Sequence, residues 1–356
     1  MTDPQPFKVL VVDDSPYCRQ VLQRVIQSDP RFTVVATAAN GHEAMAMTLR
    51  QSPDLITLDL EMPGMDGLAF LRWVAAHRPT PVVVVTHRGD EATVMKALEL
   101  GAVDVVVKPT RLASPKLAEL EHRLLAQLHG AAASSPWNLG KALALRGAGP
   151  VPDGIPVRPR APVRLVALGA STGGPAAIQA LLSRLPRDFP ASMVVSQHMP
   201  PGFTRHFARR LDRNVGLRVR EAATGDILEP GTVYICPGGR HLDLVQERDD
   251  RVRVALRREP RTLYTPSVDL MMKAAARTHG AATLGVLLTG MGRDGVEGLR
   301  AIRRAGGCTL AEAKESAVVF GMPRAAIQAG VVEHVLPLER MAGTILQLVS
   351  RKTIAS

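Results

Sequence analysis

The sequence is poor in aromatic residues, cysteine and long apolar runs, and each shortage excludes a class of protein. Only 3% of its 356 residues are aromatic, so platforms that stack single-stranded nucleic acid are scarce. The three cysteines, Cys18, Cys236 and Cys308, form no CxxC pair, which argues against a zinc site or a disulfide framework. Apolar stretches such as Leu284–Leu288 are far too short to span a bilayer. No basic start precedes an apolar run, so we see no signal peptide and expect a cytoplasmic protein that is not membrane-embedded.

Charge is unevenly distributed along the chain. Residues 1–128 carry 13 Lys/Arg against 15 Asp/Glu, a net charge of −2, whereas residues 129–356 carry 31 against 18, a net charge of +13. A basic half suits an acidic protein surface or nucleic acid, although a solvated arginine-rich exterior explains it as well. No helix-turn-helix pattern is visible in this half, and we expect no nucleic-acid partner.

Hydrophobic periodicity divides the chain into two α/β domains. In residues 1–128 short apolar runs alternate with stretches of helical spacing, which is typical of a doubly wound parallel sheet. Residues 129–162 are rich in Ala, Gly, Pro and Ser and are predicted to be a flexible linker, with a brief helical contact at Ala142–Leu145. A second alternating segment fills residues 163–356 and contains a predicted β-hairpin around Gly231–Arg257.

Acidic residues follow two predicted strands of the first domain. Asp13 and Asp14 come directly after one strand and Asp59 after another, and such loops converge on one crevice. Three gathered carboxylates would repel one another unless a cation lay among them, and Mg²⁺ suits such oxygen ligands. Thr86 and Lys108 end two further strands, where a hydroxyl and an ammonium could hold the oxygens of a phosphoryl group.

A glycine-rich turn opens the second domain. Gly169-Ala-Ser171-Thr-Gly173 lies between a predicted strand and a predicted helix, the context of a serine nucleophile on a sharp turn. A phosphate-cradling turn has the same context, and the turn alone leaves both readings open. A serine nucleophile also needs a base and an orienting acid. His198 and Asp294 each follow a later predicted strand and could supply them. The competing histidines are His206, His241, His279 and His334.

The ordered motifs of both halves resemble two linked families. Asp13-Asp14, Asp59 within Leu58–Gly67, Thr86 and Lys108-Pro109 resemble the receiver domain of response regulators. With the second half included, the chain resembles the chemotaxis protein-glutamate methylesterases, the CheB family. The segments that carry this resemblance are Gly169–Gly174, Gln197–Thr204, Tyr234–Gly239 with His241, Pro266–Asp269, Leu288–Gly295 and Gly321–Arg324.

The resemblance implies a fold, a reaction and a set of roles. The fold would be a flavodoxin-like receiver linked to an α/β methylesterase domain. The esterase would hydrolyse glutamate methyl esters on methyl-accepting chemoreceptors, releasing methanol, and many members also deamidate receptor glutamines. A histidine kinase would be the phosphodonor, Mg²⁺ would bind in the receiver, and the esterase site would need no cofactor. The implied roles are a catalytic triad (Ser171, His198, Asp294), oxyanion support (Thr172 and the Met291 N–H), the phospho-acceptor (Asp59), Mg²⁺ ligands (Asp13, Asp14, Asp59) and phosphoryl contacts (Thr86, Lys108).

Two segments depart from the family pattern. The stretch after Thr86, His87-Arg-Gly-Asp90, is shorter than usual beside the phosphorylation site. Thr309–Ser316 contains Glu312-Ala313-Lys314 where the family often has Gln-Asp/Asn-Glu. Two other hypotheses stay open, a deamidase with minor esterase activity and a receiver-controlled docking protein, whereas the lack of a helix-turn-helix pattern argues against a receiver-linked transcription factor.

Overall fold

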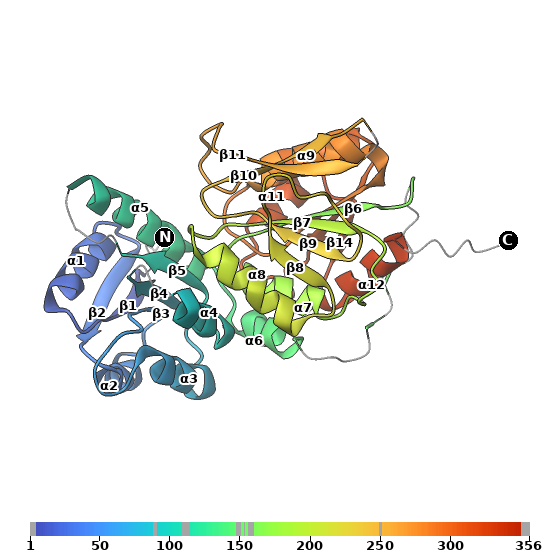
Figure 1. Ribbon diagram of the computed structural model, residues 1–356. Coiled ribbons are helices and arrows are strands. Elements are labelled where there is room, and N and C mark those ends of the chain that lie inside the picture. The colour runs from blue at the N-terminus through green and yellow to red at the C-terminus, as the bar shows by residue number, and fades with distance from the viewer. Residues whose placement is uncertain are drawn as a thin grey trace. The chain divides into compact units, whose positions relative to one another are not determined.

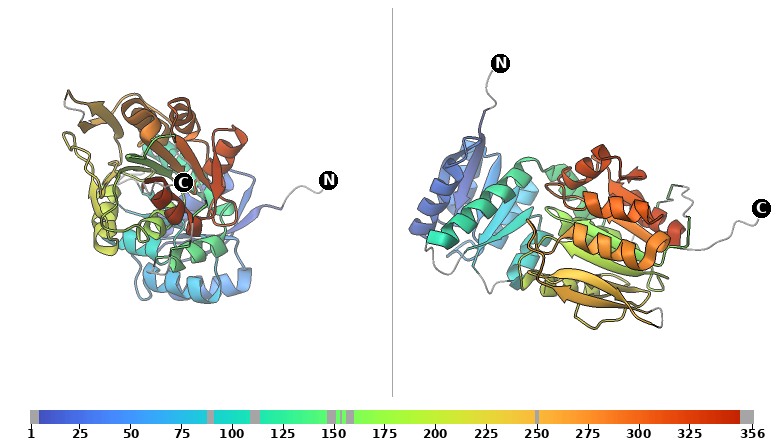
Figure 2. Two further views of the ribbon diagram at one scale, coloured as in Figure 1. Left: turned by 90° about the vertical axis from the view of Figure 1, so that its right-hand side faces the viewer. Right: turned by 90° about the horizontal axis from the view of Figure 1, so that it is seen from above.

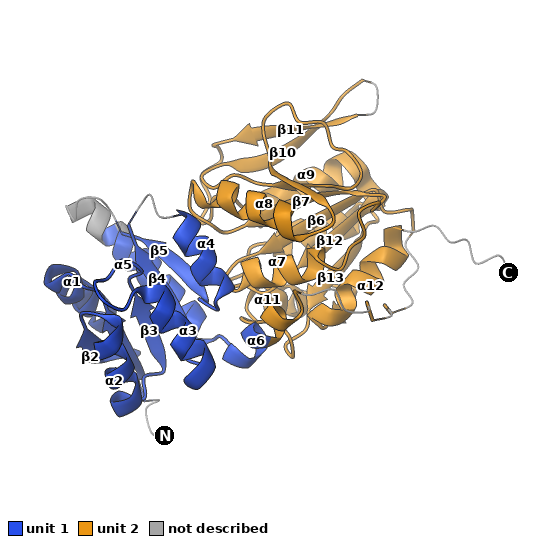
Figure 3. Ribbon diagram, turned by 60° about the horizontal axis from the view of Figure 1, so that its bottom comes forward, with its two compact units in different colours: residues 1–140 blue, residues 141–356 orange. Residues whose placement is uncertain are grey.

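The computed structural model describes residues 5–87, 91–108, 114–146, 151–152, 154–155, 160–248 and 251–349. The chain forms two compact units, residues 1–140 and residues 141–356 (Figure 3). Among the described helices, none combines the length and the apolar character that crossing a membrane requires.

The first unit is built on a five-stranded parallel sheet in the order β2-β1-β3-β4-β5 (Figure 1). This is the doubly wound arrangement that the periodicity predicts. The central strands are buried throughout because helices cover both faces, which explains their continuous runs of Val, Leu and Ile. The strands are β1 (Phe7–Val12), β2 (Phe32–Ala38), β3 (Leu55–Leu58), β4 (Val82–Thr86) and β5 (Asp104–Val107).

Five helices flank this sheet. Two of them, α1 and α5, cover one face, while α2, α3 and α4 cover the other (Figure 1). The first helix begins where the sequence gives it a start signal, because Ser15 accepts a hydrogen bond from the Cys18 N–H and Pro16 takes the first helical position. The helices are α1 (Pro16–Gln27), α2 (Gly41–Gln51), α3 (Gly67–His77), α4 (Glu91–Glu99) and α5 (Ser114–Ala132).

The segment predicted as a linker contains more helix than expected. Helix α5 continues to Ala132, and a further helix, α6 (Pro136–Ala144), follows after a short break. Leu128 and Ala131 are fully buried, which accounts for the extension of α5, and the Ser135 hydroxyl accepts from the Asn138 N–H at the start of α6. Ala and Leu also favour helix, so composition alone concealed these turns. The rest of the segment, residues 145–162, forms no helix or strand in its described part.

The second unit contains a seven-stranded parallel sheet in the order β14-β13-β12-β6-β7-β9-β8. A separate antiparallel pair, β10–β11, forms the expected hairpin and lies beside α9 (Figure 2). The strands are β6 (Leu165–Ala170), β7 (Ser192–Gln197), β8 (Arg218–Glu221), β9 (Thr232–Ile235), β10 (His241–Gln246), β11 (Val252–Arg257), β12 (Thr283–Leu287), β13 (Cys308–Glu312) and β14 (His334–Leu336).

Helices cover both faces of the larger sheet as well. On one face α9 and α10 pack together and share the buried core with α11, while α7, α8 and α12 lie on the other face (Figures 1 and 2). The helices are α7 (Gly174–Leu182), α8 (Phe203–Asn214), α9 (Val268–His279), α10 (Val296–Arg304), α11 (Met322–Gln328) and α12 (Leu338–Val349), with a short 3₁₀ turn at Gly280–Ala282.

The register of the central strands sets the position of the functional loops. Gly169 of β6 is aligned with Ser196 of β7 and with Leu287 of β12. The residues that follow these three strands therefore meet at one rim of the sheet, as is usual for ligand sites in parallel α/β sheets.

Candidate active site

Ser171 lies on a tightly held turn between β6 and α7. Its N–H donates to the Thr289 carbonyl (3.0 Å), and its carbonyl accepts from the Gly174 N–H (2.8 Å) and from the Gln197 side chain (2.8 Å). Gly173 has φ of +76°, a left-handed conformation that makes the sharp change from strand to helix possible. The serine backbone is fixed on both sides, and none of these bonds uses its hydroxyl.

The loop after β12 passes directly against this turn. A Cβ added to Gly290 would lie 2.7 Å from the Ser171 Cβ and 2.4 Å from the Met322 sulfur, so only glycine allows so close an approach. Met291 follows at once, and within the described residues its amide donates to no other group. Thr172 is buried, and its carbonyl accepts from the Thr289 hydroxyl (2.9 Å).

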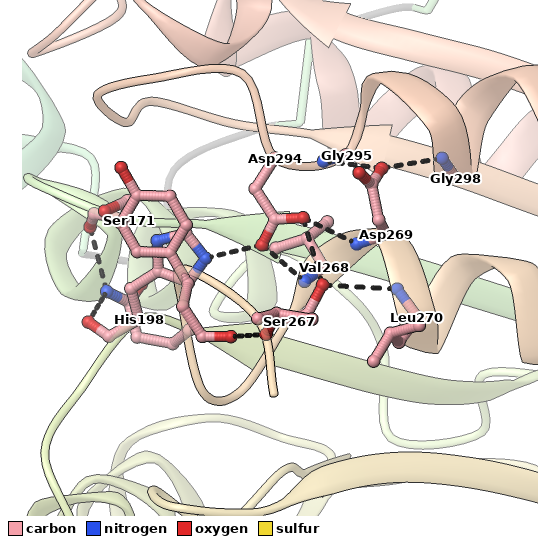
Figure 4. A network of polar contacts seen from close by, with 12 residues as sticks. Ser171, His198, Ser267, Val268, Asp269, Leu270, Asp294, Gly295 and Gly298 are labelled. Atoms are coloured by element: carbon pink, nitrogen blue, oxygen red, sulfur yellow. Dashed lines mark hydrogen bonds and ion pairs between the residues drawn. The ribbon is translucent and has the colours of Figure 1, made fainter. Parts of the chain in front are cut away.

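His198 lies beside the serine, just past β7. Its N–H donates to the Ala170 carbonyl (3.1 Å), and the Gln197 side chain donates to the carbonyls of both Ser171 and His198. Its ring Nε2 lies 2.8 Å from Asp294 Oδ2, and since a carboxylate accepts, this bond assigns the proton to Nε2 (Figure 4). The other ring nitrogen, Nδ1, is buried without a partner and points toward Ser171.

Asp294 is held as a carboxylate by the start of α9. Its oxygens accept from the Val268 N–H (2.8 Å), the Asp269 N–H (2.9 Å) and the Ser267 hydroxyl (3.1 Å), as Figure 4 shows. Burial alone would raise the pKa of Asp294, but the hydrogen bond from His198 and those from the helix N-terminus outweigh it and lower the pKa. The acid therefore stays charged, and its charge faces the His198 ring.

Several supporting residues were not predicted as site residues. Tyr264 stacks on the His198 ring, with centroids 4.2 Å apart and planes 10° apart, and fixes the ring orientation from one side. Asp269 accepts from the N–H groups of Gly295 and Gly298 and so ties the Asp294 loop to α9. Ser267 carried a usable signal, because a serine just before a helical stretch marks an N-terminus and such termini bind anions. The stacking of Tyr264 had no signal in the sequence.

The competing histidines lie elsewhere. His241 is close but serves another contact: its Nδ1 accepts from the Ser267 N–H (3.2 Å), and burial lowers its pKa so that it stays neutral. His334 is aligned through the register with Leu168, and β14 is three strands away from β6. His206 lies within α8, and His279 ends α9, where burial lowers its pKa to about 4.

The acidic residues of the first unit also gather at one rim. One carboxylate oxygen from each of Asp13, Asp14 and Asp59 lies within 4.8 Å of the others, although Asp14 is exposed and its two partners are buried. Lys108 forms ion pairs with Asp13 (2.7 Å) and with Asp59. The Thr86 hydroxyl is buried at the same strand ends without a hydrogen-bond partner. Pro109 and residues 88–90, which include most of the shortened segment after Thr86, lie outside the described residues.

The electrostatics of this pocket fit a bound cation. Burial alone would lower the pKa of Lys108, but the charges of Asp59 and Asp13 outweigh it and raise the pKa. Burial raises the pKa of Asp13, and the charge of Asp59 adds to the rise, although Lys108 opposes it. One ammonium, paired with Asp13 and Asp59, thus offsets only part of the charge of the three gathered carboxylates. A hard divalent cation with oxygen ligands would relieve the remaining repulsion.

These features define a class of protein: a receiver-like parallel unit joined to an α/β unit with a Ser–His–Asp cluster at one sheet rim. Residues 9–118 match the family described as "Response regulator receiver domain", and residues 166–345 match the one described as "CheB methylesterase". The chain belongs to the CheB methylesterase family, which confirms the resemblance seen in its motifs.

Relatives and a solved structure agree with this assignment. A protein of Geobacter sulfurreducens named protein-glutamate methylesterase/protein-glutamine glutaminase 3 is 42% identical, covering 96% of this chain and 97% of its own. Protein-glutamate methylesterase/protein-glutamine glutaminase 5 of Myxococcus xanthus is 45% identical, covering 96% of this chain and 97% of its own. The crystal structure of the Thermotoga maritima CheB methylesterase catalytic domain matches with a TM-score of 0.52 and 40% identity, covering 53% of this chain and 100% of that one.

Proposed function

We propose that this chain is a phosphorylation-activated serine hydrolase that removes methyl groups from glutamate esters on chemoreceptors. The observation that carries the proposal is the arrangement at His198: Nε2 is bound to Asp294, while Nδ1 is buried, unpartnered and directed toward Ser171. A base with a free lone pair beside a serine hydroxyl is what nucleophilic catalysis requires.

The proposed reaction proceeds through an acyl-enzyme. The Ser171 oxygen attacks the ester carbonyl carbon while its proton passes to His198 Nδ1, and Asp294 stabilises the resulting imidazolium. The bond to the methoxy group then breaks, and methanol leaves with that proton. Water attacks the acyl-enzyme in the same way, giving its proton to Nδ1. Release of the glutamate side chain returns a proton to Ser171.

Backbone groups around the serine would stabilise the oxyanion. We assign the Met291 N–H as one donor, because its loop passes against Ser171 and this amide has no partner within the described residues. Thr172 begins the turn into α7, whose N-terminal dipole adds a favourable field. No step of this scheme requires a cofactor.

Deamidation of receptor glutamines would use the same groups, with ammonia as the leaving group. The relatives' names include glutaminase, which favours this second activity. The assay is release of methanol from membranes carrying methylated chemoreceptors and of ammonia from unmodified ones, using the full-length chain. Methanol release supports the esterase, and ammonia in large excess would favour a deamidase with minor esterase activity. Release of neither product would leave a receiver-controlled docking protein as the better explanation.

The receiver would act as the switch. Asp59 would accept the phosphoryl group from a histidine kinase, and Thr86 and Lys108 would contact its oxygens. Asp13, Asp14 and Asp59 would hold Mg²⁺, which neutralises the phosphoryl charge when bound. Phosphorylation adds charge and strong acceptor oxygens, which would favour a second receiver arrangement that no longer restrains the esterase. With these proposed partners we expect the protein to act in the cytoplasm.

Removing Mg²⁺ should abolish activation and leave the esterase itself intact. A small phosphodonor should raise methanol release roughly 5- to 150-fold, the range of typical coupling energies. With a chelator present the donor should have no effect, because the three carboxylates lose the cation that offsets their repulsion. Methanol release is measured with donor, with donor and chelator, and after Mg²⁺ is restored. An undiminished stimulation without Mg²⁺ would contradict the assignment of this pocket.

A further inference from the structure

Glu312, at the end of β13, is a fully buried carboxyl group that the proposed mechanism does not use. One oxygen accepts from the Thr289 N–H (2.8 Å) and the other from the Ser316 hydroxyl (2.9 Å). Within the described part of the chain no Lys or Arg pairs with it. A buried, unpaired carboxyl group is costly, so its place beside the active-site loops calls for a reason.

Thr289 connects this carboxyl group to the nucleophile. Its carbonyl accepts from the Ser171 N–H (3.0 Å), and its hydroxyl donates to the Thr172 carbonyl (2.9 Å). The same hydroxyl accepts from the Val319 N–H (2.8 Å). Thr289 therefore fixes the Ser171 N–H and the Thr172 carbonyl, the backbone groups before and after the nucleophilic side chain. Its own N–H donates to Glu312.

We propose that Glu312 is a positioning residue whose carboxyl group holds the Thr289 loop behind Ser171 and whose ionisation modulates the hydrolysis rate. The proposal rests on the site assigned above, since it acts through Ser171. Glu312 lies in the segment that departs from the family pattern.

The hydrogen bonds can be satisfied in both protonation states. The ionised carboxylate accepts from Thr289 and from Ser316, whose oxygen also accepts from the Leu338 N–H (2.9 Å). When protonated, the carboxyl group can donate to the Ser316 oxygen, and the serine hydroxyl can turn to the Ala313 carbonyl (3.4 Å). The Thr289 contact survives in either state, so titration changes the charge without releasing the loop.

The local environment places this titration near neutrality. Burial raises the pKa of Glu312 to about 7, opposed by its hydrogen bonds from Thr289 and Ser316. The charge of Glu339 on α12 adds to the rise. The other charged groups on its own loop, Lys314 and Glu315, are exposed to solvent.

The strand order gives the sign of the effect on catalysis. Glu312 ends β13, and the strands that lead to Ser171 and His198, β6 and β7, are two and three strands away, which separates the strand ends by about 10 Å and about 14 Å at the usual spacing. Two successive hydrogen bonds through Thr289 join its carboxylate to the Ser171 backbone, so we place its negative charge nearer to the oxyanion that forms at Ser171 than to the imidazolium on His198. At an effective dielectric constant near 20 the difference slows the ionised form by about two- to threefold.

The test compares Glu312→Gln, which keeps both hydrogen bonds and cannot ionise, with wild type and with Glu315→Gln, which removes an exposed charge nearby. The ratio of wild-type to Glu312→Gln kcat/KM for methanol release should be near one at pH 5.5. It should fall about two- to threefold by pH 8.5, with a midpoint near the raised Glu312 pKa of about 7. The same ratio for Glu315→Gln should stay flat. If wild type is active and the ratio for Glu312→Gln does not change with pH, the proposal is overturned and the esterase assignment stands. If wild type is inactive, both are contradicted.

Two further measurements separate positioning from simple stability. Glu312→Ala should lower kcat by about 10- to 100-fold with little change in KM, because Ser171 loses its exact placement, and Glu312→Gln should restore kcat. Wild-type kcat in a folded Glu312→Ala would overturn the positioning role. The folded pKa is raised from its ordinary value of 4.5 to about 7. Wild type should therefore lose thermal stability relative to Glu312→Gln as pH rises through that window. If the difference in melting temperature between wild type and Glu312→Gln stayed the same across this pH range, Glu312 would not be a buried carboxyl group that ionises there.

Discussion

Replacing Ser171 with alanine is expected to lower methanol release from methylated receptors by about 10⁴-fold or more, since loss of the nucleophile removes the covalent route. The fold should be unaffected. The hydrogen bonds that fix this turn use the backbone N–H and carbonyl of Ser171, and alanine keeps both. The measurement is kcat for methanol release, with circular dichroism and thermal melting as checks on folding.

A serine that caps the C-terminus of the following helix provides the matched control. The Ser183 hydroxyl donates to the Ala180 carbonyl (3.1 Å) at the end of α7, remote from the rim. Ser183→Ala should therefore retain nearly all activity. If a folded Ser171→Ala kept more than a small fraction of the wild-type rate, another residue would have to be the nucleophile.

Replacing Asp294 with asparagine should cause a loss of similar size, about 10⁴-fold in kcat. The aspartate accepts on both oxygens: from His198 and the Val268 N–H on one, and from the Asp269 N–H and Ser267 on the other. An amide NH₂ in either orientation would face a backbone N–H donor. The His198 ring would also lose the charge that fixes its protonated nitrogen.

The same replacement should destabilise the fold, by about 1–3 kcal/mol for a buried donor left without an acceptor. Asp269→Asn is the control, because one Asp269 oxygen accepts from both Gly295 and Gly298 and an amide oxygen could do the same. Activity should fall far less in Asp269→Asn than in Asp294→Asn. Equal losses would mean that the α9 junction as a whole, rather than the Asp294 charge, supports the reaction.

The sequence predicts the sheets well because burial leaves a direct trace. Central strands such as Val82–Thr86 are covered on both faces and read as unbroken apolar runs, so the doubly wound units could be recognised. Of the helix after residue 135 only the end was expected, as the contact at Ala142–Leu145, since Ala- and Gly-rich composition hides a short helix whose start depends on one serine cap.

The candidate site was predicted from strand ends, and that logic has a clear limit. Parallel strands bring the loops after β6, β7 and β12 to one rim, so Ser171, His198 and Asp294 could be grouped by position. Their catalytic roles remain predictions until the variants above are measured. Residues that act through loop conformation left no trace: Tyr264 reaches the His198 ring only through the folded path of its loop.

Glu312 shows the same limit more sharply. Its departure from the family pattern was visible, but its hydrogen bond to Thr289 depends on the register between β12 and β13 and on the loop that follows. Periodicity predicts which residues are buried. It does not predict which buried carboxyl group lies behind a nucleophile.

The most direct test is methanol release by the full-length chain with and without a small phosphodonor, in wild type, Ser171→Ala and Asp59→Asn. We expect release that rises with the donor in wild type, is absent in Ser171→Ala, and proceeds equally with and without donor in Asp59→Asn. Donor stimulation that persists in Asp59→Asn would contradict the receiver switch. Absence of methanol from several methylated receptors under activating conditions would contradict the esterase itself.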